Sequence, residues 1–476
     1  MKARLFSIVI VLSLLAAAVG LVTPVQAAAY GTSFVTSITY QNIDTAPTTS
    51  IIINFYPENT GIPIQIQRPN LDPNAGTSVY VGGLSDLGTS FKGSAVLMSD
   101  KKLAATLVQI APSGSPVKNR PLSNGFSVGS DYVLVPSVLK NTFNETSIVT
   151  VQNVDADPAD ITLTFVPVGG GSNIVSKIYN LPSGAAKYVD LGTWGDITVS
   201  SFNGSLKINS VKHGTSTPGS VVATSLEASI TTNDVLAFEG ATTSAPTIYM
   251  PSAQCKFGPG SSTNTAYGVQ NTSDGNVQVT VNYSNGHVDG PYTLGPGAKR
   301  SFDGCGASNP AGFNGSATIS ATGGNIVAVG KLYGGGLSTA FLGFTSGAEK
   351  IALPYVRWTE AHWTDGTRQR AYIAIQNVGA SDLAAGQVTV KYYDKNGNLV
   401  GTDTLGAIPI GAKVNSNAGK LGTVGYEFGA YSDGSFGGSA IVQGPSGSQL
   451  AVVVRINTYA TSTTMYGEDY TGIPIQ

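Results

Sequence analysis

The chain has 476 residues and a formal net charge of −2, and only 11% of its residues are charged. About 25% is usual for soluble domains, and a chain so close to neutral has no strongly basic surface for nucleic acid or an anionic membrane. We therefore expect no nucleic-acid partner. The low charge and the 59 glycines together fit an exported β protein.

The N-terminus has the pattern of a secretory signal peptide. A basic start is followed by an apolar run over residues 5–18, which is short for a membrane span. Small residues then lead to a cleavage site after Ala27, with Gly20 as the alternative. No later run of about 18 apolar residues follows. We therefore expect an exported protein, extracellular or on the cell surface, with residues 1–27 as its signal peptide.

Two short markers recur along the chain at similar spacing. The pair Gln-Asn begins at Gln41, Gln152, Gln270 and Gln376, and the motif Phe-x-Gly-Ser begins at Phe91, Phe202, Phe313 and Phe436. The first marker recurs after 111, 118 and 106 residues. A period close to one small domain indicates an array of similar modules. We assign modules 1 to 4 to residues 28–128, 129–246, 247–349 and 350–470, followed by a C-terminal segment, 471–476.

The fourth repeat shows the strand pattern most clearly. Residues 387–393 alternate, which places Val388, Val390 and Tyr392 on one face of a strand. The Asn-Gly pair at 396–397 suits a hairpin turn. Further short strands are predicted at 372–377, 436–441 and 450–454. Because about seven such strands fill each repeat and no helical period appears, we predict an all-β chain, a tandem array of four immunoglobulin-like β-sandwiches.

The string I-Q-N-x-G, V-T-V-x-Y-Y-D-x-x-G and G-A over residues 372–415 supports this assignment. It resembles the immunoglobulin-like repeat modules of bacterial surface proteins, including the kind called CARDB (cell-adhesion-related). The resemblance implies an extracellular sandwich module. It covers structural positions and transfers no functional residue.

The two cysteines, Cys255 and Cys305, both lie in the third repeat. In an exported protein this favours a disulfide, whereas two sulfurs 50 residues apart without clustered histidines make a poor metal site. The acidic run 155–160 is either a solvated turn or a calcium ligand set. The expected disulfide is therefore Cys255–Cys305, and no cofactor is predicted.

No constellation of catalytic residues recurs in the repeats. The serine of Phe-x-Gly-Ser lacks the surroundings of a nucleophile elbow, and the three histidines are isolated in the sequence. We therefore expect a protein that is not an enzyme, in which the recurring phenylalanine fills the core and the glycine permits a close approach of the backbone.

An insertion before the fourth repeat carries two of the three tryptophans. Trp358 and Trp363 lie here beside Arg357 and His362. Exposed aromatic rings next to polar groups stack on sugars or anchor a protein partner. The alternative is that the tryptophans pack on their own module or on its neighbour.

Modules 2 to 4 each open with an apolar strand that contains a proline, at Pro136, Pro251 and Pro354. These prolines precede the Gln-Asn pair by 16, 19 and 22 residues, and the matching register in module 1 falls in the signal peptide. The C-terminal residues Gly472, Ile473, Pro474, Ile475 and Gln476 resemble an opening strand with no module after it. Module 1 is thus expected to lack a strand, and the tail to be a spare one.

A missing strand and a spare strand together predict a homopolymer assembled head-to-tail by β-strand exchange. The function expected is that of a structural subunit in an extracellular fibre or surface layer. Three alternatives stay open: the tail finishes its own module, it closes on module 1 in the same chain, or cleavage after Gly20 supplies the opening strand. A monomeric adhesin that binds glycans or a protein through the Trp358/Trp363 loop is the rival function.

Overall fold

The computed structural model describes residues 28–476 except 170, 259, 261, 307, 360–367, 426, 430–437, 461–464 and 476. The expected signal peptide therefore lies outside the described residues. Within them the chain is all-β, and its helices are the short 3₁₀ turns η1 (Val81–Gly83), η2 (Ser85–Leu87) and η4 (Ala418–Gly425). No helix in the described part of the chain is long and apolar enough to cross a membrane.

The strands fall into four groups. Module 1 contains β1 (Val35–Asn42), β2 (Ile51–Pro57), β3 (Ile64–Arg68), β4 (Gly76–Tyr80), β5 (Gly93–Ser99), β6 (Leu103–Ile110) and β7 (Leu122–Asn124). Module 2 contains β8 (Tyr132–Lys140), β9 (Glu145–Asn153), β10 (Ala159–Pro167), β11 (Ile174–Leu181), β12 (Ala186–Asp190), β13 (Phe202–Lys212), β14 (Val221–Ser229) and β15 (Val235–Glu239).

The second half of the chain repeats this order. Module 3 contains β16 (Thr247–Cys255), β17 (Asn264–Asn271), β18 (Val277–Tyr283), β19 (Val288–Leu294), β20 (Lys299–Asp303), β21 (Phe313–Thr322), β22 (Ile326–Gly334) and β23 (Leu337–Leu342). Module 4 contains β24 (Lys350–Leu353), β25 (Arg368–Asn377), β26 (Thr389–Asp394), β27 (Leu399–Thr404), β28 (Lys413–Ser416), β29 (Gly438–Gln443), β30 (Leu450–Tyr459), β31 (Met465–Thr471) and β32 (Ile473–Pro474).

Each module is a pair of antiparallel sheets. The inner sheets have the orders β4-β1-β6-β7, β12-β9-β14-β15, β20-β17-β22-β23 and β28-β25-β30-β31. The outer sheets have the orders β3-β2-β5, β11-β10-β13-β8, β16-β21-β18-β19 and β27-β26-β29-β24-β32. The predicted β-sandwich architecture is therefore present, while the immunoglobulin-like type stays a prediction.

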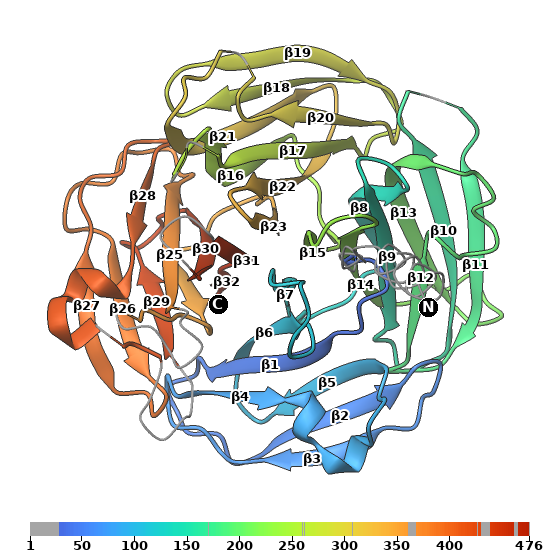
Figure 1. Ribbon diagram of the computed structural model, residues 1–476, viewed down its shortest axis with the longest axis horizontal. Helices are drawn as coiled ribbons and strands as arrows, with labels where there is room; N and C mark the ends of the chain where they lie inside the picture. The colour runs from blue at the N-terminus through green and yellow to red at the C-terminus, as the bar shows by residue number, and fades with distance from the viewer. Residues whose placement is uncertain are drawn as a thin grey trace, which may run out of the picture.

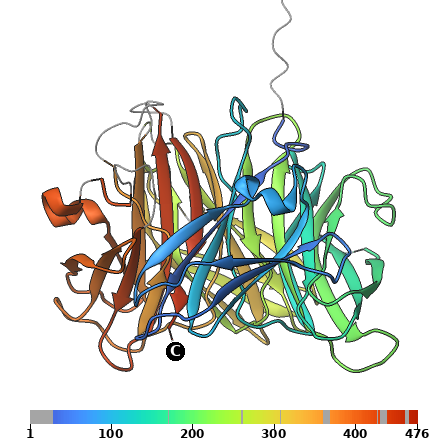
Figure 2. The same ribbon diagram turned by 90° about the horizontal axis from the view of Figure 1, so that it is seen from below.

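The four modules form a closed ring rather than an extended array (Figure 1). The last inner strands, β7, β15, β23 and β31, meet around the centre, and each contacts its counterparts in the two neighbouring modules. Module 4 closes on module 1, where the Asn124 side-chain nitrogen donates to the Thr471 carbonyl at 2.7 Å. Seen from the side, the strands run from one face of the ring towards the other (Figure 2).

Each module encloses its own apolar core because alternate side chains of both sheets point inward. In module 2, for example, Ile161, Leu163 and Phe165 of β10 pack with Val149 and Val151 of β9. All five side chains are buried. The side chains on one face of each alternating strand thus form the core of the module. The opposite faces of the inner sheets are left to contact the neighbouring modules.

The asparagine of the Gln-Asn marker fixes the turn that follows its strand. Asn42, Asn153, Asn271 and Asn377 each donate to main-chain carbonyls of this turn and of a second segment 23 to 31 residues away. Each also accepts from the main-chain N–H two residues later. All four are buried, so the side chain satisfies polar groups that would otherwise cost about 1–3 kcal/mol each.

The serine of Phe-x-Gly-Ser bonds across the junction to the next module. The hydroxyls of Ser94, Ser205, Ser316 and Ser439 donate to the carbonyls of Gly184, Gly297, Gly411 and Asn74 at 2.6, 2.8, 2.6 and 3.5 Å. At three junctions the marker glutamine donates to the same carbonyl, namely Gln152, Gln376 and Gln41. The two markers therefore meet where modules join, and of these serine bonds only the one from Ser439 to Asn74 also closes the ring.

The aromatic residue of this motif packs as the sequence predicted. Phe91, Phe202 and Phe313 lie edge-on against Phe55, Phe165 and Tyr283, with ring centroids 5.8, 6.1 and 6.1 Å apart. Phe436 lies outside the described residues.

Replacing the marker glycine Gly204 with alanine is expected to destabilise the protein by about 2 kcal/mol, the usual cost of overpacking. A Cβ there would lie 2.2 Å from the main-chain oxygen of Val166, which cannot yield as a flexible side chain would. Gly195 in the same module has nothing within 4 Å of such a Cβ and is the matched control. Urea denaturation measures both variants, and equal midpoints would contradict the close-approach role.

Candidate functional site

The free edge of module 1 is the feature that most separates this module from the others. In modules 2, 3 and 4 the strands β13, β21 and β29 pair with the opening strands β8, β16 and β24. The equivalent strand β5 pairs with β2, and no strand among the described residues lies on its other side. The Gly93 carbonyl at the start of β5 accepts from the Tyr188 hydroxyl of module 2 at 2.6 Å, and the rest of this edge is available to another strand.

The core of module 1 is correspondingly less enclosed. Ala95 and Leu97 of β5 are half-buried, whereas their counterparts in β13, Leu206 and Ile208, are fully buried. Module 1 therefore leaves apolar surface open at the place where the other modules insert their opening strand.

The first described residues do not run along this edge. The main-chain nitrogens of Ala29 and Tyr30 donate to the carbonyls of Thr232 and Ser229 in module 2, both at 2.8 Å. The Tyr30 hydroxyl donates to the Asp190 carboxylate at 3.0 Å, and burial, aided by that carboxylate, raises the pKa of Tyr30 to about 12. The segment just after the expected cleavage site is therefore held against module 2.

The C-terminal tail is paired within its own module, which corrects the interpretation of it as a spare strand. Ile473 and Pro474 pair with Ala352 and Ile351 of β24. Modules 2 and 3 have the same contact, as the bridges Leu134–Ala241 and Tyr249–Phe344. In modules 2, 3 and 4 the segment after the last inner strand therefore closes its own module, before the next module opens in the first two cases. Gln476 lies outside the described residues.

The tail is nevertheless held by few interactions. The main-chain nitrogens of Gly472 and Ile475 donate to the carbonyls of Val452 and Lys350 at 2.7 and 2.9 Å. Pro474 is exposed, and the side chains of Ile473 and Ile475 are only partly covered. The tail thus lies at a sheet edge and not in the core.

Trp358 is packed inside module 4, in line with the second of the two alternatives for this loop. It is 8% exposed, and its ring lies edge-on to Tyr372 with centroids 5.7 Å apart. The Arg370 guanidinium lies 4.9 Å from the Trp358 ring centroid. Arg357 lies over the Tyr355 ring at 4.6 Å, while His362 and Trp363 fall outside the described residues. Trp358 therefore cannot stack on a ligand without unpacking the module.

Cys255 and Cys305 form a disulfide, with Cα atoms 4.7 Å apart. Cys255 ends β16 of the outer sheet, and Cys305 follows β20 of the inner sheet. The bond thus links the two layers of module 3. In the described part of the chain, no group of three or more histidine, cysteine or acidic side chains is placed to hold a metal ion.

A buried charged cluster at the junction of modules 2 and 3 had no counterpart in the sequence predictions. The ammonium of Lys331 forms an ion pair with Glu227, whose side chain is completely buried. The ammonium of Lys299 donates to Ser137 and Asn203, both at 3.0 Å. Asn203 is the variable residue of Phe-x-Gly-Ser. Lys299 lies two residues after Gly297, and Lys413 lies two residues after the equivalent Gly411 of module 4. This recurrence of lysine is the signal that could have revealed the cluster.

Burial sets the charges in this cluster. It raises the pKa of Glu145 to about 8, with a smaller effect of the Glu227 charge in the same direction. It also lowers the pKa of Lys299 to about 7, helped by the neighbouring Lys331. Near neutral pH the Lys331–Glu227 ion pair therefore carries the main charge at the junction and joins the two modules.

Comparisons with known proteins do not assign this chain to a family. No family model and no curated protein matches it. The solved structures that match include two described as "Crystal structure of tetra-tandem repeat in extending region of large adhesion protein" and "Biofilm associated protein - BSP domain". The first is 12% identical to this chain, with a TM-score of 0.10, and the match covers 92% of this chain and 95% of that one. The second is 8% identical, with a TM-score of 0.13, and the match covers 93% of this chain and 91% of that one. At such TM-scores neither likeness carries an argument about fold or function.

Proposed function

We propose that the protein is a secreted structural subunit whose copies associate outside the cell by strand addition at the free edge of module 1. The observation that carries this proposal is the unpaired edge of β5, beside apolar side chains that the other modules cover. Strand addition satisfies the main-chain groups of such an edge and extends the sheet. The closed ring leaves this edge as the place where one more strand completes a module.

The occupant we propose is the tail of a second copy, in which Ile473 and Ile475 would face the core and Pro474 would point to the opposite side. This segment has the apolar-proline pattern of the opening strands, and in its own module it pairs through only two residues. Exchanging the tail between copies replaces main-chain bonds of about 1 kcal/mol each by similar ones. The added burial of Ala95 and Leu97 is then the net driving force.

Repeated exchange joins different surfaces of the two copies, so it makes a chain of rings rather than a closed dimer. The rival function, an adhesin that binds glycans or a protein partner, relied on Trp358 and Trp363. Trp358 is packed in the core of module 4, while Trp363 lies outside the described residues, so the free edge of module 1 is the better supported candidate.

Truncating the mature protein after Thr471 is expected to abolish long assemblies while leaving the modules folded. Electron microscopy and sedimentation velocity would compare residues 28–476 with residues 28–471, and circular dichroism would verify the fold.

A synthetic peptide of the β8 sequence should occupy β5 and also suppress assembly. The control peptide carries aspartate at the positions of Val133 and Val135, whose side chains are buried in module 2. Strand exchange at this edge would be excluded if assemblies kept their length both after the truncation and, for the full-length protein, in the presence of the β8 peptide.

A further inference from the structure

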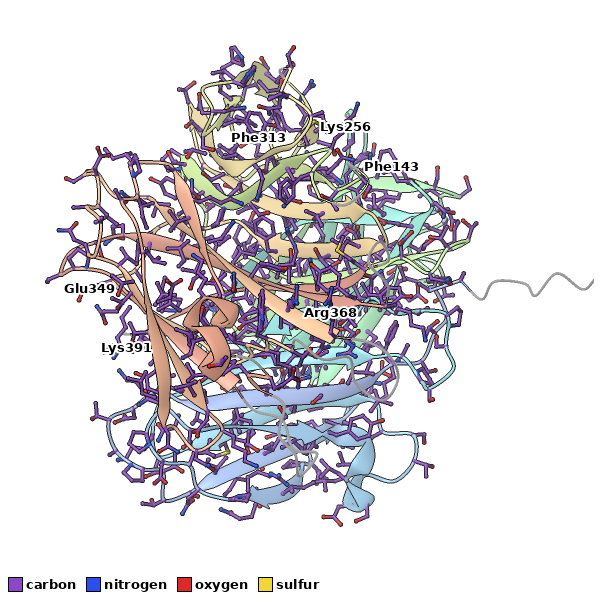
Figure 3. The ribbon with its side chains drawn as sticks, turned by 60° about the vertical axis from the view of Figure 1, so that its left-hand side comes forward. Phe143, Lys256, Phe313, Glu349, Arg368 and Lys391 are labelled. Carbon is purple, nitrogen blue, oxygen red and sulfur yellow. A yellow bond between two sulfur atoms is a disulfide. The ribbon has the colours of Figure 1, made fainter. Side chains whose placement is uncertain are left out.

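A pocket of about 320 Å³ lies between modules 3 and 4, apart from the free edge of module 1. Module 3 contributes β16 and β21 with the loop before β17, and module 4 contributes the outward face of β28, β25 and β30. Figure 3 labels Phe313 at the start of β21 and Arg368 at the start of β25, one on each of these modules. The walls include the rings of Phe257, Tyr372 and Tyr459 together with the polar side chains of Lys413, Arg455 and Asn457.

The preceding junction, between modules 2 and 3, shows what normally fills this position. By strand register, Lys413 and Arg455 of module 4 correspond to Lys299 and Lys331 of module 3. At that junction module 2 supplies two acidic residues to the cationic pair, Glu227 and Glu145. Two cations and two carboxyl groups thus share one buried site.

At the junction of modules 3 and 4 both of these acidic residues are replaced by uncharged ones. Glu145 corresponds to Thr263, since each forms the same bridge to the preceding loop, Thr142–Glu145 and Phe257–Thr263. Glu227 corresponds to Leu332, because their partners Ser147 and Thr265 occupy the same position in β9 and β17. Thr263 lines the pocket. Because threonine is shorter than glutamate, the space that Glu145 fills at the preceding junction is open here.

The positive charge in the pocket is only partly balanced. Arg455 is paired with Asp469 of its own module at 2.7 Å. The ammonium of Lys413 donates to the amide oxygen of Asn314 at 2.8 Å, and no carboxylate of the described residues forms an ion pair with it. Burial, and then the charge of Arg455, lowers the pKa of Lys413 to about 7. One cation therefore faces the pocket without an anion.

A polar atom in the pocket lacks a hydrogen-bond partner among the described residues. Asn457 is 8% exposed, and within the described part of the chain its side-chain oxygen accepts no hydrogen bond. Its nitrogen lies 3.4 Å from the Tyr459 hydroxyl. An anionic group on a flat apolar body would pair with Lys413 and lie against the aromatic walls. A hydrogen-bond donor on the same body would in addition satisfy Asn457, but the charge is the larger contribution.

We propose that this pocket binds a small organic carboxylate, whose anionic group takes the place that Glu145 fills at the preceding junction. The carboxylate lies near the Lys413 ammonium, and the body of the ligand lies against Phe257, Tyr372 and Tyr459. Such a site is independent of assembly through module 1.

The test compares benzoate with benzamide, which has the same shape and no charge. Isothermal titration of the mature protein at pH 6, where Lys413 is protonated, should show benzoate binding at least about tenfold more tightly than benzamide, as expected for one charge-assisted contact. Glucuronate replaces benzoate in a second titration, to separate a hydroxylated from an aromatic body.

Two variants locate the binding site. Lys413→Met should reduce the affinity for benzoate to that for benzamide, because it removes the cation and keeps the volume. Thr263→Glu should abolish binding of benzoate and raise the unfolding midpoint, because it restores the carboxyl group that module 2 carries at this position. The proposal is overturned if neither benzoate nor glucuronate binds, if benzoate binds no better than benzamide, or if both variants bind benzoate as the unaltered protein does.

Discussion

Lys331→Met is expected to destabilise the protein by about 3–5 kcal/mol, the usual cost of removing one partner from a buried ion pair. The carboxylate of Glu227 is fully buried and has Lys331 as its ion-pair partner. Lys331 also donates to Ser137 of β8 at 3.1 Å, so the substitution loosens the junction between modules 2 and 3. Urea denaturation followed by far-UV circular dichroism measures the loss of stability.

Two further variants separate the buried charge from other effects. Lys391→Met replaces an exposed lysine of β26 and should change the free energy of unfolding by less than about 0.5 kcal/mol. The double variant Lys331→Met with Glu227→Met should recover most of the lost stability, because it leaves no charge unpaired. A single variant as stable as the unaltered protein would mean that Glu227 is neutral or hydrated in the native state.

Removing the disulfide by Cys255→Ala with Cys305→Ala is expected to destabilise module 3 by about 4 kcal/mol on the chain-entropy account. The bond joins residues 50 positions apart and thereby restricts the unfolded chain between the two layers of the module. Hydrogen exchange followed by mass spectrometry would show faster exchange in β16, β17 and β21, with module 2 much less affected.

A reductant provides the matched control for this variant. Dithiothreitol should lower the unfolding midpoint of the unaltered protein and leave that of the double variant unchanged. Two free thiols in the unaltered protein after non-reducing preparation, or a double variant with an unchanged midpoint, would refute a stabilising disulfide.

The sequence by itself determined the local structure of this protein. Alternation of the kind seen in residues 387–393 predicts a strand with one buried face, because successive side chains point to opposite sides. The Asn-Gly pair at 396–397 correctly marked the turn between β26 and β27, where Gly397 has a φ of 86°. The Gln-Asn and Phe-x-Gly-Ser markers gave the number of repeats, since each depends on bonds and packing that every module must make again.

Only the tertiary structure decided how the modules and the tail are placed. The markers recur equally in an open array and in a ring, and closure depends on contacts such as Ser439 with Asn74, which lie 365 residues apart. The tail pattern suits any sheet edge, so its sequence could not choose between β24 of its own module and β5 of another copy. The charged pair Lys331–Glu227 and the pocket at Lys413 likewise arise where faces of separate modules meet, and the free energy of such contacts is set by burial that no single repeat contains.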